Sequence, residues 1–149
     1  MDKPQTAIEI LSFAVERERQ SEKFYSDTAK SIDDPNFKKL FEIFAMEEKM
    51  HAARLEFELI KNGKTVPNAQ QNIKLNDLQI TIDVPNHMKK MYLEILEAAI
   101  AKEDKSFRTY TALLNKMEDP EVIKTLEDLI EEEIRHKLIL EIKYNQISG

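Results

Sequence analysis

Six ionisable side chains occur where helical periodicity would place core residues, and together they could bind two metal ions. They are four glutamates and two histidines: Glu18, Glu48, His51, Glu103, Glu133 and His136. Carboxylate oxygens and imidazole nitrogens suit iron, manganese and zinc. Burying four carboxylates together is costly unless cations compensate them, and two dications supply a matching charge. The sequence therefore predicts a two-metal carboxylate centre.

The spacing of the two histidines supports this interpretation. Glu48 and His51 are three residues apart, and so are Glu133 and His136. Residues three apart share one face of a helix, so each pair can reach inward together. One Glu from each of two helices, with Glu-x-x-His from the other two, is the ligand pattern of di-metal carboxylate bundles. We therefore assign the six residues to one centre by matching this pattern.

Two further acids and a third histidine are assigned no ligand role. Glu47 and Glu132 precede the histidines of the pattern by four residues and also share their face. The apolar stripe favours the glutamates three residues away, so Glu47 and Glu132 are expected to be flanking surface acids. His87 has no partner glutamate in the pattern, and we expect it at the surface.

Tyrosines and serines recur near the expected ligands. Tyr25 and Tyr110 lie two turns beyond the ligands of their helices, on the same stripe. Each could direct its hydroxyl at a ligand carboxylate and support the catalytic centre from outside, although both could also be ordinary core tyrosines. Ser21 and Ser106, one turn from the ligands, could leave room or hold a water.

Four amphipathic helices must position these residues. Only 2 Gly and 5 Pro occur, and 34% of the residues are charged, which favours an all-helical chain. Asp34-Pro35 and Asp119-Pro120 each combine a helix N-cap with a proline at the first helical position. The predicted helices cover 5–31, 36–61, 87–116 and 121–147. The ligands fall near the middle of each helix, so they can meet at one level of a bundle.

The sequence repeats itself without a gap at an offset of 85 residues. The repeat pairs the expected ligands, the two tyrosines and the two Asp-Pro breaks, which chance similarity between amphipathic helices would not align. A helical hairpin over 5–61 is therefore repeated over 87–147. We expect one domain over 1–149, with residues 62–86 connecting the two hairpins.

That connection is long for a helical bundle, where most run about 2–8 residues. An extended segment at about 3.3 Å per residue could span a helix of roughly 40 Å. Its apolar residues favour packing against the bundle over a disordered linker. We therefore expect an all-α, ferritin-like four-helix bundle built from two repeated helical hairpins joined by a long crossover.

The motifs resemble those of the rubrerythrin family of ferritin-like proteins. They are Ala-Val-x-x-Glu-x-x-Ser-x-x-Phe-Tyr at 14–25, Glu-Glu-Lys-x-His at 47–51, Ala-Ile-x-x-Glu at 99–103 and Glu-Glu-Glu-x-x-His at 131–136. The resemblance implies a non-haem di-iron centre, with two Fe ions and a peroxidase or ferroxidase activity. Hydrogen peroxide or dioxygen would be the oxidant. It also implies a homodimer, in which some family members exchange helices.

The chain departs from the rubrerythrin pattern in two respects. It contains no Cys, so it lacks the rubredoxin-type iron site of rubrerythrins proper. Electrons would then come from a separate donor, such as a rubredoxin-like protein. Rubrerythrins also use an extra glutamate about one turn beyond the third-helix ligand, where this chain has Ser106. We therefore expect a simpler and more symmetric centre. This departure argues against efficient peroxide reduction more strongly than it argues against metal binding.

Bulk properties exclude several other classes of function. The net charge of -6 disfavours nucleic acid, because phosphate binding needs a basic face. No apolar run approaches the roughly 20 residues of a membrane span, and the N-terminus lacks an apolar signal-peptide core. We therefore expect a soluble cytoplasmic protein.

Two other functions remain open from the sequence. The first is iron binding or storage, with iron oxidation but without a dedicated substrate. The second is a structural role in which the same ligands hold zinc or another redox-silent metal. Manganese is a further substitute for iron, because hard carboxylate sites also accept it, so a di-manganese, catalase-like protein is also open.

Overall fold

Four long helices make up the computed structural model, which describes residues 3–60 and 84–149. They are α1 (Lys3–Lys30), α2 (Pro35–Ile60), α3 (Lys89–Leu114) and α4 (Pro120–Ser148), with a short 3-10 turn η2 (Asn86–Met88) before α3. Each long helix begins and ends within two residues of the predicted bounds. Most of the predicted crossover, 62–83, lies outside the described residues.

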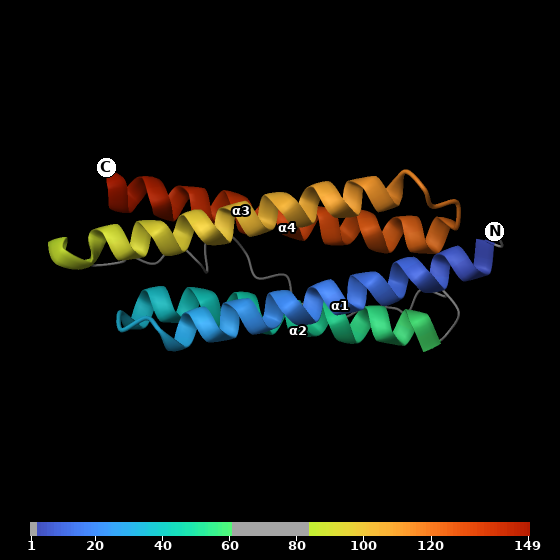
Figure 1. Cartoon of the computed structure of the whole chain (residues 1–149), viewed down its shortest axis with the longest axis horizontal. Coiled ribbons are helices and arrows are strands. Elements are labelled where there is room, and N and C mark those ends of the chain that lie inside the picture. The colour runs from blue at the N-terminus through green and yellow to red at the C-terminus, as the bar shows by residue number, and fades with distance from the viewer. Residues whose placement is uncertain (1–2, 61–83) are drawn as a thin grey trace.

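The helices pair as two hairpins, α1 with α2 and α3 with α4. Figure 1 shows the two hairpins side by side, with the four long helices roughly aligned along the molecule. This arrangement confirms the predicted all-helical architecture and is consistent with a four-helix bundle. None of the helices over 3–60 and 84–149 has the length and apolarity that a membrane crossing requires.

The Asp-Pro breaks begin the second helix of each hairpin. The Asp34 carboxylate accepts a hydrogen bond from the backbone N–H of Phe37 at 2.8 Å, and Asp119 accepts one from Glu121 at 2.9 Å. In each case a proline follows as the first residue of the helix. These caps satisfy N–H groups that a helix start leaves without partners, as the sequence predicts.

Two apolar clusters fill the bundle on either side of its middle. The first includes Tyr25, Phe37, Phe41, Phe44, Leu96 and Leu140. The second includes Leu11, Leu55, Tyr110, Val122, Leu126 and Leu129. Along every helix the expected ligands fall between residues of the first cluster and residues of the second. Burial of each large apolar side chain contributes about 1.5–3 kcal/mol, so the two clusters can hold a costly polar layer between them.

Polar side chains also join the hairpins beside the middle of the bundle. Arg17 on α1 donates to the Ser106 hydroxyl on α3 at 3.1 Å, and Lys102 on α3 donates to the Ser21 hydroxyl on α1. The two hydrogen bonds are related by the 85-residue repeat. Both serines therefore accept a hydrogen bond between α1 and α3. The sequence alone suggests instead that they leave room or hold a water.

A second polar group joins α2 to α4. Arg54 on α2 forms an ion pair with Asp128 on α4 at 3.0 Å, and Thr125 donates to the buried carboxylate of Glu58 at 2.5 Å. These contacts tie the second helix of one hairpin to the second helix of the other. The hairpins are therefore held together on both sides of the bundle.

Candidate metal centre

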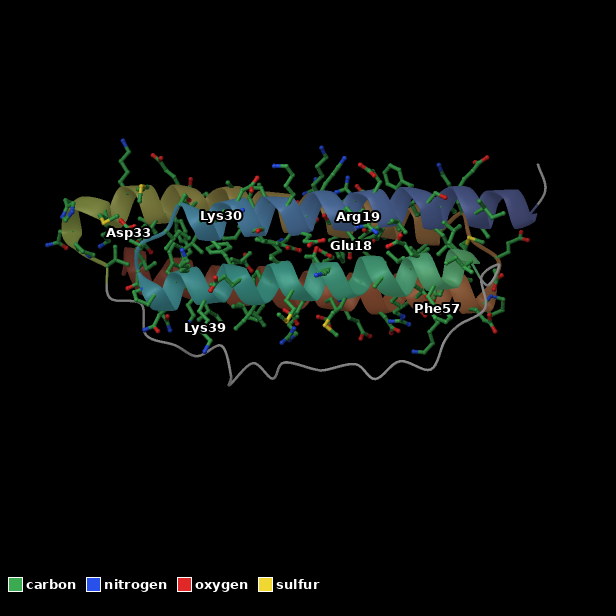
Figure 2. The ribbon with its side chains drawn as sticks, turned by 90° about the horizontal axis from the view of Figure 1, so that it is seen from below. Glu18, Arg19, Lys30, Asp33, Lys39 and Phe57 are labelled. Atoms are coloured by element: carbon green, nitrogen blue, oxygen red, sulfur yellow. The ribbon has the colours of Figure 1, made fainter. Side chains whose placement is uncertain are left out.

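The four glutamates of the predicted centre are fully buried. Glu18, Glu48, Glu103 and Glu133 each have a relative exposure of 0%, although carboxylates are almost never fully buried without a partner. Each comes from a different helix and lies near its middle. Figure 2 shows Glu18 in the interior, halfway along the bundle. The helical stripe thus places four acids in one layer, as the sequence predicts.

One half of the centre surrounds His51. Its Nδ1 atom lies 3.1 Å from Glu18 Oε1 and 3.4 Å from Glu48 Oε1. Glu133 joins these three residues, and one ligand atom from each of the four lies within 4.8 Å of the others. The His51 side chain keeps 13% of its surface exposed, so this half is not fully closed to solvent.

The other half surrounds His136, which is fully buried. Its Nδ1 atom lies 3.4 Å from Glu103 Oε1 and 3.8 Å from Glu48 Oε1. Glu103, Glu133 and His136 also offer ligand atoms within 4.8 Å of one another. Glu133 belongs to both groups and lies between the two histidines. The structure therefore brings together all six residues that the sequence places at the centre.

The two tyrosines differ in their contacts with the acids. Tyr25 donates its hydroxyl hydrogen bond to Glu103. The Tyr110 hydroxyl is also buried, but it has no hydrogen-bond partner among the described residues. Burial, together with the nearby carboxylates, raises the pKa of both tyrosines well above the usual value, so both carry their proton. Their supporting role at the centre stays a prediction.

This difference gives an expected result for a matched pair of variants. Tyr25→Phe should destabilise the metal-free protein by about 1–3 kcal/mol, because a buried carboxylate loses its donor. Tyr110→Phe should be neutral or stabilising, because its hydroxyl makes no hydrogen bond within the described part of the chain. Urea unfolding of the two variants, followed by circular dichroism, measures both changes. Equal effects of the two substitutions would contradict the assignment.

One expectation about the flanking acids is wrong. Glu47 is buried, with 6% exposure, because its carboxylate contacts His136 Nε2 at 3.0 Å and Arg135 at 3.0 Å. Glu132 is half-buried and pairs with Arg135 at 3.2 Å. Both acids bind an arginine that the ligand pattern does not include. His87 is exposed, as expected.

Burial changes the ionisation of the acids in the absence of metal. Burial, reinforced by the charge of Glu48, raises the pKa of Glu18 to about 7. Burial, followed by the charges of Glu48 and Glu103, raises the pKa of Glu133 well above its ordinary value. Glu18 and Glu133 therefore retain protons more readily than exposed glutamates do. Glu103 differs, because burial is outweighed by its contacts with other groups of the layer, including His136, which lower its pKa to about 2.

The histidines have the opposite balance of effects. Burial alone would lower the pKa of His51, but its hydrogen bond with Glu18 and the nearby carboxylate of Glu48 raise that pKa well above the usual range. Burial likewise opposes the charge on His136, but contacts with Glu103 and other acids raise its pKa to about 10. Without metal, the two imidazolium groups supply the positive charge next to the acids.

The protein's own positive groups leave much of the carboxylate layer without partners. Buried atoms with no hydrogen bond among the described residues include one oxygen each of Glu18 and Glu103, both oxygens of Glu48 and Glu133, and Nδ1 of His136. Such atoms are rare because each costs free energy. Hard oxygen ligands with one imidazole on either side fit a pair of divalent cations. The residues present therefore suit the metal centre predicted from the sequence.

Binding of metal should release protons. Metal ligands must be unprotonated, whereas the raised pKa values leave His51, His136 and Glu133 protonated near pH 7 in the metal-free protein. We therefore expect the apparent affinity for zinc, a redox-silent probe, to rise between pH 6 and pH 8. Calorimetric titration in buffers of different ionisation enthalpy counts the protons released. A heat that does not depend on the buffer would contradict this expectation.

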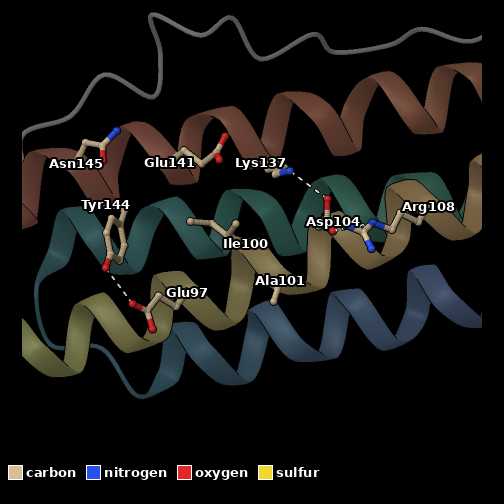
Figure 3. Close-up of a pocket in the computed structure, with 9 residues that line it drawn as sticks. All are labelled: Glu97, Ile100, Ala101, Asp104, Arg108, Lys137, Glu141, Tyr144 and Asn145. Carbon is tan, nitrogen blue, oxygen red and sulfur yellow. Dashed lines mark hydrogen bonds and ion pairs between the residues drawn. The ribbon is translucent and has the colours of Figure 1, made fainter.

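A surface groove lies apart from the carboxylate layer. It encloses about 550 Å³ between α3 and α4, and its lining includes Glu97, Asp104, Lys137 and Tyr144. Figure 3 shows two contacts across it: Tyr144 donates to Glu97 at 2.9 Å, and Lys137 donates to Asp104 at 3.0 Å. Both acids therefore have a partner across the groove, and none of the six ligand residues lines it.

The fold and the buried carboxylate layer define a helical bundle with a candidate two-metal site. The model of the rubrerythrin family matches residues 9–144, and the chain belongs to this family. A solved structure of a protein from Xanthomonas campestris has 18% sequence identity and a TM-score of 0.70. That match covers 99% of this chain and 94% of the other, and it shows a shared fold. No curated protein matches the chain.

Proposed function

We propose that this protein is a non-haem di-iron oxidoreductase that reduces hydrogen peroxide with electrons from a separate donor protein. The observation that supports this proposal is the layer of four fully buried glutamates between two histidines, with many of their oxygens lacking partners. Two ferrous ions held there would supply the two electrons that convert hydrogen peroxide and two protons into two water molecules.

In this proposal the residues at the metal centre have different roles. Glu18 and His51 hold one metal position, and Glu103 and His136 hold the other. Glu48 approaches both histidines and Glu133 belongs to both ligand groups, so these two acids would serve as ligands to both positions. Tyr25 orients Glu103 through its hydrogen bond, and the aromatic cluster beside it excludes water. The partly exposed edge at His51 lets small oxidants and protons reach the centre.

The partners of the protein follow from the same proposal. The sequence contains no Cys, so no iron–sulfur or rubredoxin-type site in this chain can pass electrons to the centre. A separate redox protein, such as a rubredoxin, would supply them. We also propose a homodimer, as is common in the rubrerythrin family.

Oxidation of ferrous iron by dioxygen or peroxide is the second candidate function. It is favoured by Ser106, which accepts a hydrogen bond from Arg17 where rubrerythrins use an additional glutamate. A centre without that glutamate can retain metal binding while it reduces peroxide less efficiently. The two activities differ in what is consumed, because an oxidase of free iron turns over added ferrous ions.

Rapid mixing tests the proposed function. Protein loaded anaerobically with ferrous iron is mixed with one equivalent of hydrogen peroxide, and absorption and Mössbauer spectra follow the iron. We expect both ions to become ferric at once, and a reduced rubredoxin to restore them through further cycles. Iron that stays ferrous after mixing would contradict a redox role. Turnover of excess ferrous ions without the donor would favour iron oxidation.

A further inference from the structure

The two halves of the centre differ in what supports their histidines. We propose that Glu47, held by Arg135, is a positioning residue that orients His136 and makes the His136 half the tighter of the two metal positions. This inference rests on the proposed metal centre and adds an order of affinity to it. The two imidazole rings differ in their contacts and in their burial.

His136 uses both of its ring nitrogens. Nε2 lies 3.0 Å from Glu47 Oε1, whereas Nδ1 faces the ligand layer at 3.4 Å from Glu103 Oε1. A neutral imidazole carries one proton, and a carboxylate at Nε2 retains that proton there. The lone pair of Nδ1 is then directed at the ligand carboxylates. Phe44 stacks on the ring at 4.1 Å between centroids and 19° between planes, which fixes its tilt.

Arg135 holds Glu47 in this position. Its Nη1 atom lies 3.0 Å from Glu47 Oε2 and 3.2 Å from Glu132 Oε2. The two oxygens of Glu47 therefore have different partners, His136 on one side and Arg135 on the other. Because the guanidinium already neutralises these acids, we assign Glu47 as the outer partner of His136 and Glu132 as a second partner of Arg135, and not as ligands of a third metal site.

His51 has no such carboxylate partner in the part of the chain that the structure describes. Its Nδ1 atom faces Glu18 and Glu48, but Nε2 has no hydrogen bond within the described part of the chain. Its side chain is 13% exposed, whereas that of His136 is fully buried. Among residues 3–60 and 84–149, the ligand contacts are therefore the polar contacts that orient the ring of His51.

The internal repeat explains how the asymmetry arises. The repeat equivalent of Arg135 is Met50, whose side chain is 40% exposed and carries no charge. The equivalent of Glu47 is Glu132, which forms an ion pair with Arg135 rather than a contact with His51. The difference at this one repeat position, Arg135 in place of Met50, thus brings both Glu47 and Glu132 to the His136 side. Outer carboxylate partners of metal-bound histidines are worth about 10- to 100-fold in affinity.

Competition with a chromophoric chelator tests this order on the intact protein, with zinc as the metal. The wild type should bind two zinc ions in two distinguishable steps. Glu47→Ala should weaken the tighter step by about 10- to 100-fold and leave the weaker step unchanged. Glu132→Ala is the matched control, because it removes an acid from the same arginine without removing a hydrogen bond to His136. It should leave both steps unchanged.

A spectroscopic measurement separates positioning from a general loss of stability. In the cobalt-substituted protein, proton NMR resolves the shifted N–H signals of bound histidines. One such signal should exchange slowly with solvent in the wild type and in Glu132→Ala, and rapidly in Glu47→Ala. Glu47→Gln, which keeps the side-chain volume, serves if the alanine variant does not fold. It should weaken the tighter step and speed the same exchange, because the charge that retains the Nε2 proton is lost.

Two results would overturn the inference. Zinc steps of equal affinity in the wild type would remove the predicted order. Equal effects of Glu47→Ala and Glu132→Ala on affinity and exchange would remove the role of Glu47, while metal binding itself would stand. Failure of the wild type to bind any zinc or iron would instead contradict the proposed function, so the two failures are distinguishable.

Discussion

Replacing Glu133 with Gln is expected to abolish tight binding of both metal ions. Glu133 offers a ligand atom to the His51 group and to the His136 group, so one substitution reaches both halves. Gln keeps the volume of the side chain but removes the negative charge and one anionic oxygen. The loss in affinity should exceed the roughly 100-fold that removal of an outer partner costs.

Equilibrium dialysis against ferrous iron under anaerobic conditions, followed by metal analysis, measures this effect. Glu131→Gln is the matched control, because Glu131 is exposed on the same turn of α4 and belongs to neither ligand group. The control should bind as much iron as the wild type. If Glu133→Gln retained both ions with little change in affinity, Glu133 would not be a bridging ligand.

Removal of the metals is expected to lower the melting temperature strongly. A ligand at about 100 times its Kd stabilises the folded state by about 2.7 kcal/mol per site. For a domain of this size each kcal/mol shifts Tm by about 2–4 °C, so two sites correspond to about 10–20 °C. Calorimetric scans with and without a chelator measure the difference. A Tm that is unchanged by chelation would mean that the carboxylate layer needs no metal for stability.

In the metal-free protein, removal of the Glu133 charge is expected to raise the free energy of unfolding at neutral pH. Burial, reinforced by neighbouring acids, raises the pKa of Glu133 well above its ordinary value, so its stability contribution falls as pH rises from that ordinary value toward the raised one. Metal-free Glu133→Gln should therefore be more stable than the metal-free wild type at pH 7. The difference should disappear near pH 4, where Glu133 is protonated in both the folded and the unfolded chain. Urea unfolding at the two pH values measures it.

The sequence predicts the helices and the ligand layer well because both depend on local periodicity. Each ligand replaces a core residue of an apolar stripe, and the repeat independently selects the same positions in both hairpins. The Asp-Pro breaks determine where α2 and α4 begin through caps that involve only neighbouring residues. These features require no knowledge of how the hairpins pack against each other.

The misassigned residue depends on contacts between the hairpins. Glu47 precedes a ligand by one position, and the stripe of α2 alone gives no reason to bury it. It is buried because Arg135 and His136 on α4 meet its carboxylate. The Ser21 and Ser106 contacts also cross between hairpins, although basic Arg17 and Lys102 at equivalent repeat positions are a signal that the sequence contains.

A metal count on the wild-type protein shows directly whether the buried carboxylate layer binds two ions. Purified protein is stripped with a chelator, loaded with ferrous iron without oxygen, freed of excess metal and analysed for iron per chain, with its helicity recorded alongside. We expect two iron ions per folded chain. A fully helical protein that retains no iron, zinc or manganese would contradict this expectation, because four glutamates would then remain buried with no cation between them.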